Sequence, residues 1–500
     1  MGVKKNRRLH IIGAGNAGRS LACEVKEKPV LGEVAAFLDD DPSLIGKEIE
    51  GIPVLGPVRH VAKLLRRKAG DEAVIAMPQA DVEYIKELYG ILKAAGFERI
   101  RILPGISQII DGDVHLIQTR SVDPQDLLGR TPVAVNLRES LAYLRDKRVL
   151  VTGAGGSIGS ELCRQLLSGG VERLYLFGHG ENSIFQIDRE LQILQDEGVG
   201  EKTTIVTVIG DLKDAGYINH IIKNLKADAI FHTAAYKHVP LMESNPVAVI
   251  ENNVFGTQNL IRAARSNKVR RFVLISTDKA VEPVSVYGAS KYLCEKLVRQ
   301  TALELKNGEE SPAFMVVRFG NVLGSRGSIV PLFQKQIEKG GPVSLTHPDM
   351  RRWFMTIPEA CSLVLKAGGV GENGGLYLLD MGEPVRIRDM AEQMIRFYGY
   401  EPEVDIKIEY IGLRPGEKLD EKLFAADELP VKTKFKKINR IERRSASVDA
   451  AGAAAQPADL DGLLEKLAPV CSFDAAKPEL YRNSAYLRAA LKEAIPSMLN

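Results

Sequence analysis

The sequence predicts an α/β protein with two doubly wound parallel-sheet domains, the second carrying a small C-terminal substrate-binding subdomain. Short β-branched apolar runs alternate with amphipathic helical stretches along most of the chain, which is the pattern of βαβ units. Two runs, Leu9–Ile12 and Arg148–Val151, are each followed by a glycine-rich turn and a helical stretch. Because a glycine turn of this kind opens a doubly wound sheet, each predicts the start of a Rossmann-like domain.

Further strands are expected after each of these openings. They are short, apolar and bounded by turn residues, as strands buried on both faces of a parallel sheet are. In the first domain they are Val34–Leu38 and Ala73–Ala76. In the second domain they are Leu174–Phe177, Thr204–Ile209, Ala229–His232, Arg271–Ser276 and Ala313–Arg318. The helices after the two glycine turns are expected to start at Arg19 and Ser160.

These elements suggest four segments. We expect an N-terminal nucleotide-binding-like domain over 1–110, a proline-bearing linker outside both sheets over 111–146, and a larger domain over 147–444. Residues 445–500 are expected to form a flexible linker and a helical tail. The linker prediction rests on the small-residue run Ser445–Pro457, and the helices are expected at Leu460–Leu467 and Tyr481–Ala494.

Composition excludes several classes of protein. The 500 residues include 67 basic and 64 acidic side chains, a net charge of +3, without the basic excess of a nucleic-acid-binding protein. The five cysteines are scattered and never spaced CxxC, so neither a disulfide framework nor a zinc site is expected. The histidines form no HExxH pattern, and no uncharged apolar run approaches membrane-spanning length. The sequence thus predicts a cytoplasmic protein that binds neither metal nor nucleic acid.

The second glycine turn carries the clearer nucleotide-binding pattern. Gly153, Gly156 and Gly159 let the backbone turn tightly and approach a pyrophosphate. Ser157 and Ile158 lie in the same turn, ahead of the helix expected from Ser160, whose free N–H groups favour phosphate. Further cofactor contacts are expected after the third and fourth strands of this domain, from Asp211, Leu212, Ala234 and Ala235.

The second strand of each domain bears on cofactor choice. In the larger domain no acid follows this strand until Glu181, which admits the 2′-phosphate of NADP and removes the usual anchor of NAD. NADP is therefore favoured there, with NAD as the alternative. In the first domain the strand ends in Asp39, Asp40 and Asp41, an NAD-like feature, but no catalytic set follows. Nucleotide binding and a structural or oligomerisation role both stay open for that domain.

Tyr287 and Lys291 form a YxxxK pair after the fifth strand of the larger domain. Residues four apart share one helix face, so the ammonium of Lys291 can stabilise a phenolate at Tyr287. A tyrosine placed in this way can take a proton from a carbinol while hydride passes to a nicotinamide.

Seven strings in order carry a family resemblance: TGAGGSIGSEL, HTAAYKHVPLMESNP, NNVFGTQN, STDKAVEPVSVYGASK, RFGNVLGSRGSIVPLF, RRWFMTIPEA and LRPGEKLDEKLF. Over roughly 147–424 the chain resembles the extended short-chain dehydrogenases/reductases. Within them it is most similar to the bacterial UDP-N-acetylglucosamine 4,6-dehydratases of the polysaccharide-biosynthesis (CapD-like) family. The resemblance implies a tightly bound, recycled NADP or NAD and UDP-N-acetylglucosamine as substrate.

The same resemblance implies roles for the residues after the fifth strand. Asp278 would be the acid that protonates the leaving hydroxyl, and Lys279 the base at C5. Tyr287, assisted by Thr277 and Lys291, would be the base at C4. The UDP-sugar pocket would include Lys237, Asn321, Arg326, Arg352 and Arg414.

Two departures from the family pattern matter. Many long two-domain relatives carry methionine where this chain has Tyr287. They also usually carry transmembrane helices ahead of the first domain, so the protein is expected to be membrane-associated if an N-terminal segment is missing. The resemblance also implies a homo-oligomer. A UDP-hexosamine epimerase, which would need Tyr287 and Lys291 but neither Asp278 nor Lys279, and a non-catalytic nucleotide-binding protein remain alternatives.

Overall fold

The computed structural model describes residues 8–27, 32–65, 70–103, 120–121, 140–305, 312–443 and 459–499. The chain divides into two compact units, Met1–Arg138 and Glu139–Asn500. Both are α/β units built on a mainly parallel sheet, so the predicted fold class is confirmed.

Unit 1 is built on a seven-stranded sheet in the order β3-β4-β2-β1-β5-β6-β7. Strands β4, β2, β1, β5 and β6 run parallel, and the edge strands β3 and β7 run antiparallel to their neighbours. The strands are β1 Arg8–Ile12, β2 Glu33–Leu38, β3 Glu48–Ile49, β4 Ile52–Leu55, β5 Glu72–Ile75, β6 Arg99–Ile102 and β7 Arg120–Ser121. The helices are α1 Asn16–Glu27, η2 Val58–His60, α2 Val61–Leu64 and α3 Val82–Ala94.

The predicted linker over 111–146 contributes to both units, which corrects the expectation that it lies outside both sheets. Arg120–Ser121 pairs antiparallel with β6 as the edge strand β7. Further along, the 3-10 turn η5, Ala142–Leu144, belongs to unit 2, where the Tyr143 hydroxyl donates to the Leu365 carbonyl at 2.8 Å. Sequence periodicity missed both pieces because two residues of edge strand and one turn of helix are too short to show a period. Residues 111–119 and 122–139 of the predicted linker lie outside the described residues.

Unit 2 is built on a nine-stranded sheet in the order β10-β9-β8-β11-β12-β13-β18-β22-β21. The first seven strands are parallel, and the hairpin β21–β22 extends the sheet antiparallel to β18. The strands are β8 Arg148–Thr152, β9 Arg173–Gly178, β10 Thr204–Ile209, β11 Ala229–His232, β12 Arg271–Thr277, β13 Ala313–Phe319, β18 Leu376–Leu379, β21 Glu428–Lys432 and β22 Ile438–Arg443.

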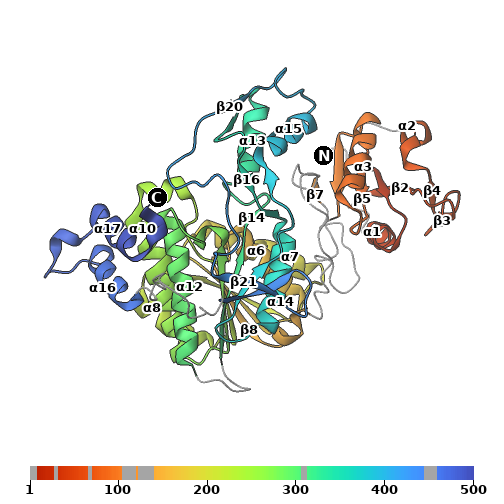
Figure 1. The fold of residues 1–500 in the computed structure, drawn as a ribbon. Helices are drawn as coiled ribbons and strands as arrows, with labels where there is room; N and C mark the ends of the chain where they lie inside the picture. Colours follow the sequence, from red (N-terminus) through yellow and green to blue (C-terminus); the bar gives the residue numbers. More distant parts are fainter. Residues whose placement is uncertain are drawn as a thin grey trace, which may run out of the picture. The chain divides into compact units, whose positions relative to one another are not determined.

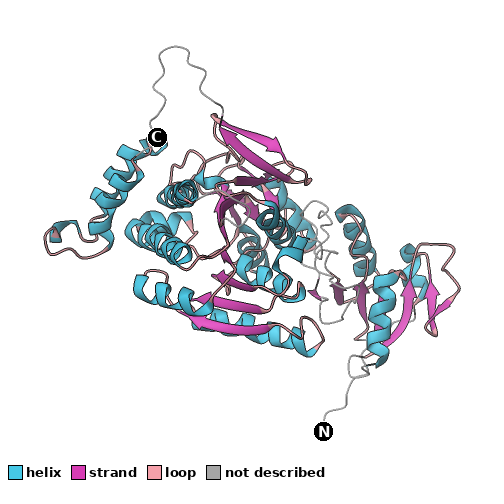
Figure 2. Cartoon of the chain, turned by 90° about the horizontal axis from the view of Figure 1, so that it is seen from below, coloured by secondary structure: helices cyan, strands magenta, loops and turns pink. Residues whose placement is uncertain are grey.

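Helices cover both faces of this sheet (Figures 1 and 2). One face carries α6 Ser157–Ser168, α7 Glu181–Asp196 and α14 Ile357–Val370. The other carries α8 Ala215–Leu225, α11 Gly256–Ser266 and α12 Val286–Glu304. Shorter helices precede α11: α9 Val239–Ser244, α10 Pro246–Val249 and the π-helix η6 Ile250–Phe255. Strand β8 lies between β9 and β11, so the chain reverses its winding direction there, the point at which doubly wound sheets bind ligands.

A small subdomain adds three two-stranded sheets and two helices to unit 2 (Figure 1). The sheets pair β14 Asn321–Val322 with β17 Phe354–Met355, β15 Val343–Leu345 with β20 Ile408–Tyr410, and β16 Arg351–Arg352 with β19 Val385–Arg386. The helices are α13 Ile329–Glu338 and α15 Ile387–Phe397. The chain after β20 returns to the main sheet, which brings late residues close to β12.

The C-terminal helices α16 Leu460–Cys471 and α17 Ser484–Ala494 pack on α10 and α12. Their apolar side chains, Leu467 and Leu487 among them, are buried in the same core cluster as the helices α8, α11 and α12. The short 3-10 turns η8 Pro478–Leu480 and η9 Pro496–Leu499 flank α17. The helical tail is therefore part of unit 2, while the predicted linker Ser445–Pro457 lies outside the described residues.

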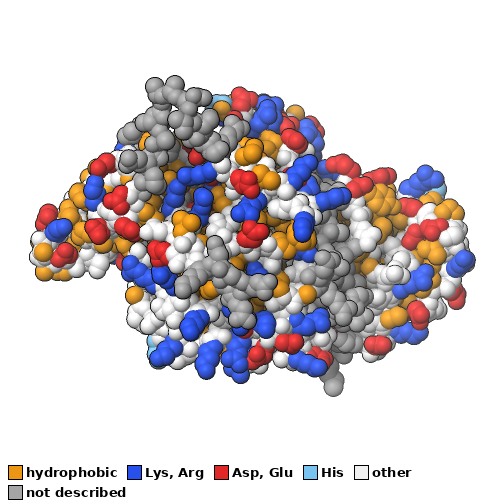
Figure 3. Space-filling model, turned by 60° about the horizontal axis from the view of Figure 1, so that its bottom comes forward, with side chains coloured by type: hydrophobic (Ala, Val, Ile, Leu, Met, Phe, Trp, Pro, Cys, Tyr) orange, Lys and Arg blue, Asp and Glu red, His pale blue; other side chains and the backbone are white. Residues whose placement is uncertain are grey.

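Acidic and basic side chains are intermixed over the face drawn in Figure 3, as the near-balanced composition predicts. Among the helices of the described ranges, none combines the length and the hydropathy needed to cross a membrane.

Candidate active site

The glycine turn after β8 is shaped for a diphosphate. Gly153 has a φ of +69°, a conformation that favours glycine. A Cβ on Gly159 would lie 2.2 Å from the Gly153 carbonyl oxygen, so only glycine allows the helix to approach the turn. Gly156 is the N-cap of α6 and offers no capping side chain, which leaves the first N–H groups of the helix, from Ser157 and Ile158 onward, free for an anion. This geometry fits a dinucleotide cofactor.

The neighbouring strand ends form the rest of the cofactor crevice. A Cβ on Gly153 would lie 2.8 Å from Ala234, so this turn and the Ala234–Ala235 segment after β11 are in close approach. Asp211, half-exposed after β10, accepts from the Lys213 backbone N–H at 2.9 Å. The side chain of Leu212 is buried in the core instead, so only its backbone is available to a ligand.

The helix of the YxxxK pair is fixed at its first turn. The Ser285 hydroxyl oxygen caps it by accepting from the Gly288 N–H at 3.0 Å, and Glu243 accepts from the Val286 N–H at 2.7 Å. Tyr287 and Lys291 are both buried on α12. Burial raises the pKa of the Tyr287 phenol, the Asp278 carboxylate raises it further, and a hydrogen bond with Thr277 lowers it. Burial lowers the pKa of the Lys291 ammonium.

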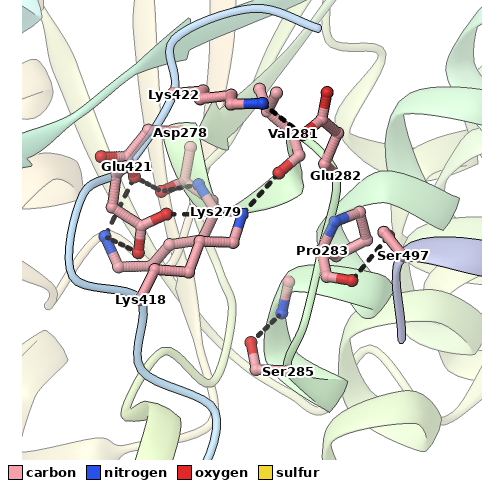
Figure 4. A network of polar contacts seen from close by, with 12 residues as sticks. Asp278, Lys279, Val281, Glu282, Pro283, Ser285, Lys418, Glu421, Lys422 and Ser497 are labelled. Atoms are coloured by element: carbon pink, nitrogen blue, oxygen red, sulfur yellow. Dashed lines mark hydrogen bonds and ion pairs between the residues drawn. The ribbon is translucent and has the colours of Figure 1, made fainter. Parts of the chain in front are cut away.

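Asp278 and Lys279 lie in the 3-10 turn η7, Asp278–Ala280, directly after β12. Asp278 is fully buried; its Oδ1 accepts from the Thr277 hydroxyl at 2.8 Å and from Lys279 Nζ at 3.0 Å (Figure 4). Its Oδ2 makes no hydrogen bond within the described residues. A Cβ on Gly320 would lie 3.3 Å from this oxygen, so the glycine leaves space beside it. The structure thus places a carboxyl oxygen without a partner next to an amine.

Glu421 joins this pair and was missed by the sequence analysis. Its side chain is 4% exposed, and its Oε1 lies 3.8 Å from Lys279 Nζ. Asn321, a predicted substrate residue, accepts from the same Nζ at 3.1 Å through its Oδ1. Burial raises the pKa of the Glu421 carboxyl, and Lys279 opposes that rise. Glu421 belongs to one of the quoted strings, but its sequence gives no sign that this acid, among several nearby, is the buried one.

Arg352, another predicted substrate residue, is bonded to backbone carbonyls. Its guanidinium is buried and donates to the carbonyl oxygens of Arg351, Lys418 and Leu419 at 2.7–2.8 Å. These bonds use most of its donors, so Arg352 holds the 418–421 segment against the site. A direct contact between Arg352 and the UDP-sugar stays a prediction.

The other predicted substrate residues lie in two places. Arg326 lies on the glycine turn, where its guanidinium donates to the Gly155 carbonyl at 2.9 Å. Lys237 donates to the Ser325 hydroxyl at 3.3 Å, one residue from Arg326. Arg414 is exposed and pairs with Glu417 at 2.6 Å, and no contact joins it to the Asp278–Lys279 pair in the described part of the chain.

Two further observations bear on the site. His232 is buried between the hydroxyls of Thr152 and Thr257, at 2.7 and 2.8 Å, and burial lowers its pKa to about 3. It is therefore a neutral core histidine.

Within the described ranges, no group of three or more His, Cys, Asp or Glu side chains is arranged to hold a metal ion.

A doubly wound sheet with a glycine turn at its switch point and a buried Tyr–Lys pair on a neighbouring helix defines an extended short-chain dehydrogenase/reductase. Within that class the chain belongs to the polysaccharide biosynthesis protein family, whose model matches residues 149–443. A second model, described as a CoA-binding domain, matches residues 3–104.

Similar proteins agree with this assignment. The capsular polysaccharide biosynthesis protein CapD of Staphylococcus aureus is 41% identical over 88% of this chain and 72% of its own length. The probable polysaccharide biosynthesis protein EpsC of Bacillus subtilis is 41% identical over 87% of this chain and 72% of its own. A UDP-glucose 4-epimerase of Rickettsia bellii is 34% identical over 57% of this chain and 79% of its own. The solved structure of Pen from Bacillus thuringiensis matches with a TM-score of 0.53 at 32% identity, covering 60% of this chain and 89% of that one.

Proposed function

We propose that the protein dehydrates UDP-N-acetylglucosamine to a UDP-4-keto-6-deoxy-hexosamine for the synthesis of a bacterial surface polysaccharide. The reaction comprises oxidation at C4, elimination of water across C5–C6 and return of the hydride to C6. The observation that carries the proposal is the 3.0 Å hydrogen bond between Lys279 Nζ and Asp278 Oδ1, beside the buried Tyr287. A simple alcohol dehydrogenase needs neither of these two groups.

The Asp278–Lys279 pair supplies an acid and a base by one proton shift. When the proton between them lies on Asp278, the carboxyl can protonate the C6 hydroxyl as it leaves. Lys279 is then a neutral amine that can remove the C5 proton. After elimination Asp278 is again anionic and Lys279 again an ammonium, so the ion pair is restored. Asn321, at 3.1 Å, orients the amine.

Oxidation at C4 is assigned to the YxxxK helix. Tyr287 takes the C4 hydroxyl proton, supported by the Thr277 hydrogen bond. Lys291, one turn further along the same helix, would stabilise the phenolate by its charge. A nicotinamide cofactor held at the glycine turn would supply the acceptor for the C4 hydride and the donor that returns it. We propose NADP, with NAD as the alternative, because β9 ends in Gly178 and an exposed His179 without a carboxylate to repel a 2′-phosphate.

Substrate binding is assigned to groups around this pair. Arg326 and Lys237 provide cations beside the glycine turn, and Arg414 provides one at the rim. The names of the relatives support the substrate class, since CapD and EpsC are named for polysaccharide biosynthesis and the Rickettsia relatives for UDP-glucose 4-epimerisation. An epimerase is the second candidate, favoured by those same Rickettsia relatives and needing only Tyr287 and Lys291.

The test is incubation with UDP-N-acetylglucosamine in deuterated water, read by proton NMR. A 4-keto-6-deoxy product with deuterium at C5 is expected, and its methyl coupling gives the C5 configuration. Formation of a 4-epimer alone would identify an epimerase and reject the roles of Asp278 and Lys279. Mass analysis of nucleotide released by denaturing the purified protein distinguishes NADP from NAD.

A further inference from the structure

Glu421 is held in place by its backbone. It lies in the segment after β20, where the Trp353 indole N–H donates to the Glu421 carbonyl oxygen at 2.9 Å. Arg352 fixes the carbonyls of Lys418 and Leu419 on the preceding residues. Lys418 Nζ in turn donates to the Val281 carbonyl at 2.8 Å, which ties the segment to the turn that follows Lys279 (Figure 4). The carboxylate is therefore presented to Lys279 by a rigid wall.

Lys279 has three polar partners in the described residues, and they differ in whether they can pass its proton on to water. The amide of Asn321 cannot carry a proton at neutral pH. Asp278 exchanges a proton with Lys279 in the proposed reaction, but its side chain is fully buried and gives no route to water. Glu421 Oε1, at 3.8 Å, is the remaining group within ion-pair distance.

Charges of both signs surround the carboxyl of Glu421. Burial raises the pKa of its carboxyl, and the negative charge of Asp278 adds to the rise. Lys279, Lys418 and Arg352 oppose it, with Lys418 Nζ at 3.7 Å from Oε2. Tyr287, on α12, also faces the carboxylate. Oε2 makes no hydrogen bond within the described residues, so it can take a proton without breaking one.

Glu421 also borders a cavity of about 420 Å³. The cavity is lined by Asp349, Arg351, Trp353, Pro384, Leu419, Asp420 and Glu421. Asp349, Arg351 and Asp420 are exposed, so the cavity communicates with solvent and has room for water. Of its lining residues, Glu421 is the one whose carboxylate lies 3.8 Å from Lys279 Nζ.

We propose that Glu421 is a positioning residue that passes protons between Lys279 and water in this cavity, so that the hydrogen returned to C5 comes from solvent. This inference rests on the proposed dehydration. The C5–H bond breaks as the C5=C6 bond forms and the C6–O bond breaks, and the proton goes to Lys279 Nζ. Lys279 passes it to Glu421 and Glu421 to water. A solvent proton returns by the same route and adds to C5 when hydride adds to C6, so no net charge or electron is gained.

The experiment compares the full-length protein with Glu421→Gln in deuterated water, with UDP-N-acetylglucosamine carrying protium at C5 and its bound cofactor in place. The unaltered protein is expected to give product with deuterium at C5. In Glu421→Gln the removed proton stays on the lysine with two deuterons, so about one third of the early product should keep protium at C5. A purely structural role would slow product formation without changing this fraction.

Two matched variants serve as controls. Asp420→Asn removes a neighbouring exposed carboxylate of the same cavity that does not contact Lys279, and full deuteration is expected. Glu421→Asp keeps a carboxylate and is expected to restore deuterium at C5. Full deuteration in an active Glu421→Gln would overturn the proposal.

If Glu421→Gln is inactive, the absorbance of reduced nicotinamide distinguishes a block in the reaction from a defect in folding or binding. Reduced cofactor that accumulates on adding substrate would show that C4 is oxidised and that the later proton transfers through Lys279 are blocked, which supports the proposal. No reduced cofactor would mean that Glu421 serves folding or binding, and the proposal would be rejected. The proposed function fails separately, if the unaltered protein itself makes no 4-keto-6-deoxy product.

Discussion

The two units contain similar glycine turns with different surroundings. In unit 1 a Cβ on Gly18 would lie 2.0 Å from the Gly13 carbonyl oxygen, and in unit 2 a Cβ on Gly159 would lie 2.2 Å from the Gly153 carbonyl oxygen. In both, the first glycine has a positive φ and the helix starts within the turn. The same steric requirement therefore selected glycine at matching positions twice.

The residue after the first glycine shows where the two units diverge. The Ala14 N–H donates to the Asp39 carboxylate at 2.7 Å, whereas the Ala154 N–H donates to the Phe177 carbonyl at 3.2 Å. In unit 1 this N–H of the turn is therefore bonded to a carboxylate, whereas in unit 2 the equivalent N–H is bonded to a backbone carbonyl. A negative charge disfavours a nearby phosphate, so the turn of unit 2 is the better phosphate site.

The larger difference lies at the other strand ends. In unit 2 the ends of β12 and β13 bring together Asp278, Lys279 and Asn321. No comparable acid–base pair follows the strands of unit 1 in its described residues. A glycine turn thus specifies a place for a nucleotide, and the chemistry depends on which side chains the neighbouring strands deliver to that place.

The largest expected effect comes from removing the acid or the base in unit 2. Asp278→Asn and Lys279→Met should each lower the rate of 4-keto-6-deoxy product formation by about 10²- to 10⁴-fold, the usual contribution of such groups. Asp39→Asn, the matched carboxylate of unit 1, should leave the rate unchanged. The measurement is the initial rate by proton NMR. A loss of rate in Asp39→Asn would show that unit 1 contributes to the reaction.

Replacing the third glycine of each turn by alanine separates the steric effect on stability from the effect on cofactor binding. Gly18→Ala and Gly159→Ala each force a Cβ onto a carbonyl oxygen and should destabilise their own unit by about 1–3 kcal/mol. Only Gly159→Ala should also lower the cofactor content of the purified protein. Thermal unfolding and nucleotide released on denaturation are the two measurements, and equal cofactor loss in both variants would contradict the assignment.

A smaller effect is expected from the buried histidine of unit 2. His232 is held neutral by burial, with its pKa lowered to about 3, whereas in the unfolded chain it takes a proton below about pH 6.5. Stability is therefore lost as the pH falls below that value, by about 2 kcal/mol at pH 5. His232→Gln should remove this part of the pH dependence measured by denaturant unfolding between pH 7 and 5. Substitution of the exposed His220 should leave the dependence as it is in the unaltered protein.

The smallest effect is expected at Asp39. Asp39→Ala removes the hydrogen bond to the Ala14 N–H and should cost unit 1 about 1 kcal/mol, as a single partly buried hydrogen bond does. The unfolding transition of unit 2 should be unchanged. A larger loss, or a loss of stability in unit 2, would mean that the turn of unit 1 supports more than its own helix.

Much of the fold was predictable because local sequence patterns specify its strands and helices. The strands from β8 to β13 were predicted to within a residue or two of their observed ends. Both helices after the glycine turns begin three residues earlier than expected, because the turn glycine itself, Gly156 in unit 2, is the N-cap. The edge strand β7 was placed outside the sheets, since two residues carry no period.

The candidate site was predictable only in part. Asp278, Lys279, Tyr287 and Lys291 lie within one strand end and one helix start, so their proximity follows from short sequence separation. Arg352 and Glu421 depend on a chain that leaves the main sheet through the subdomain and returns. No local pattern says that the guanidinium of Arg352 would meet backbone carbonyls or that Glu421, rather than Asp420, would point inward.

The sequence by itself determined the two βαβ sheets, the two glycine turns and the linked acid, amine and phenol after β12, because periodicity and residue type act over a few residues. Only the tertiary structure decided which charged groups are buried and what they contact. Burial changes the free energy of a charge by amounts that depend on every neighbour. Those neighbours come from segments more than a hundred residues apart, as Lys279 and Glu421 do.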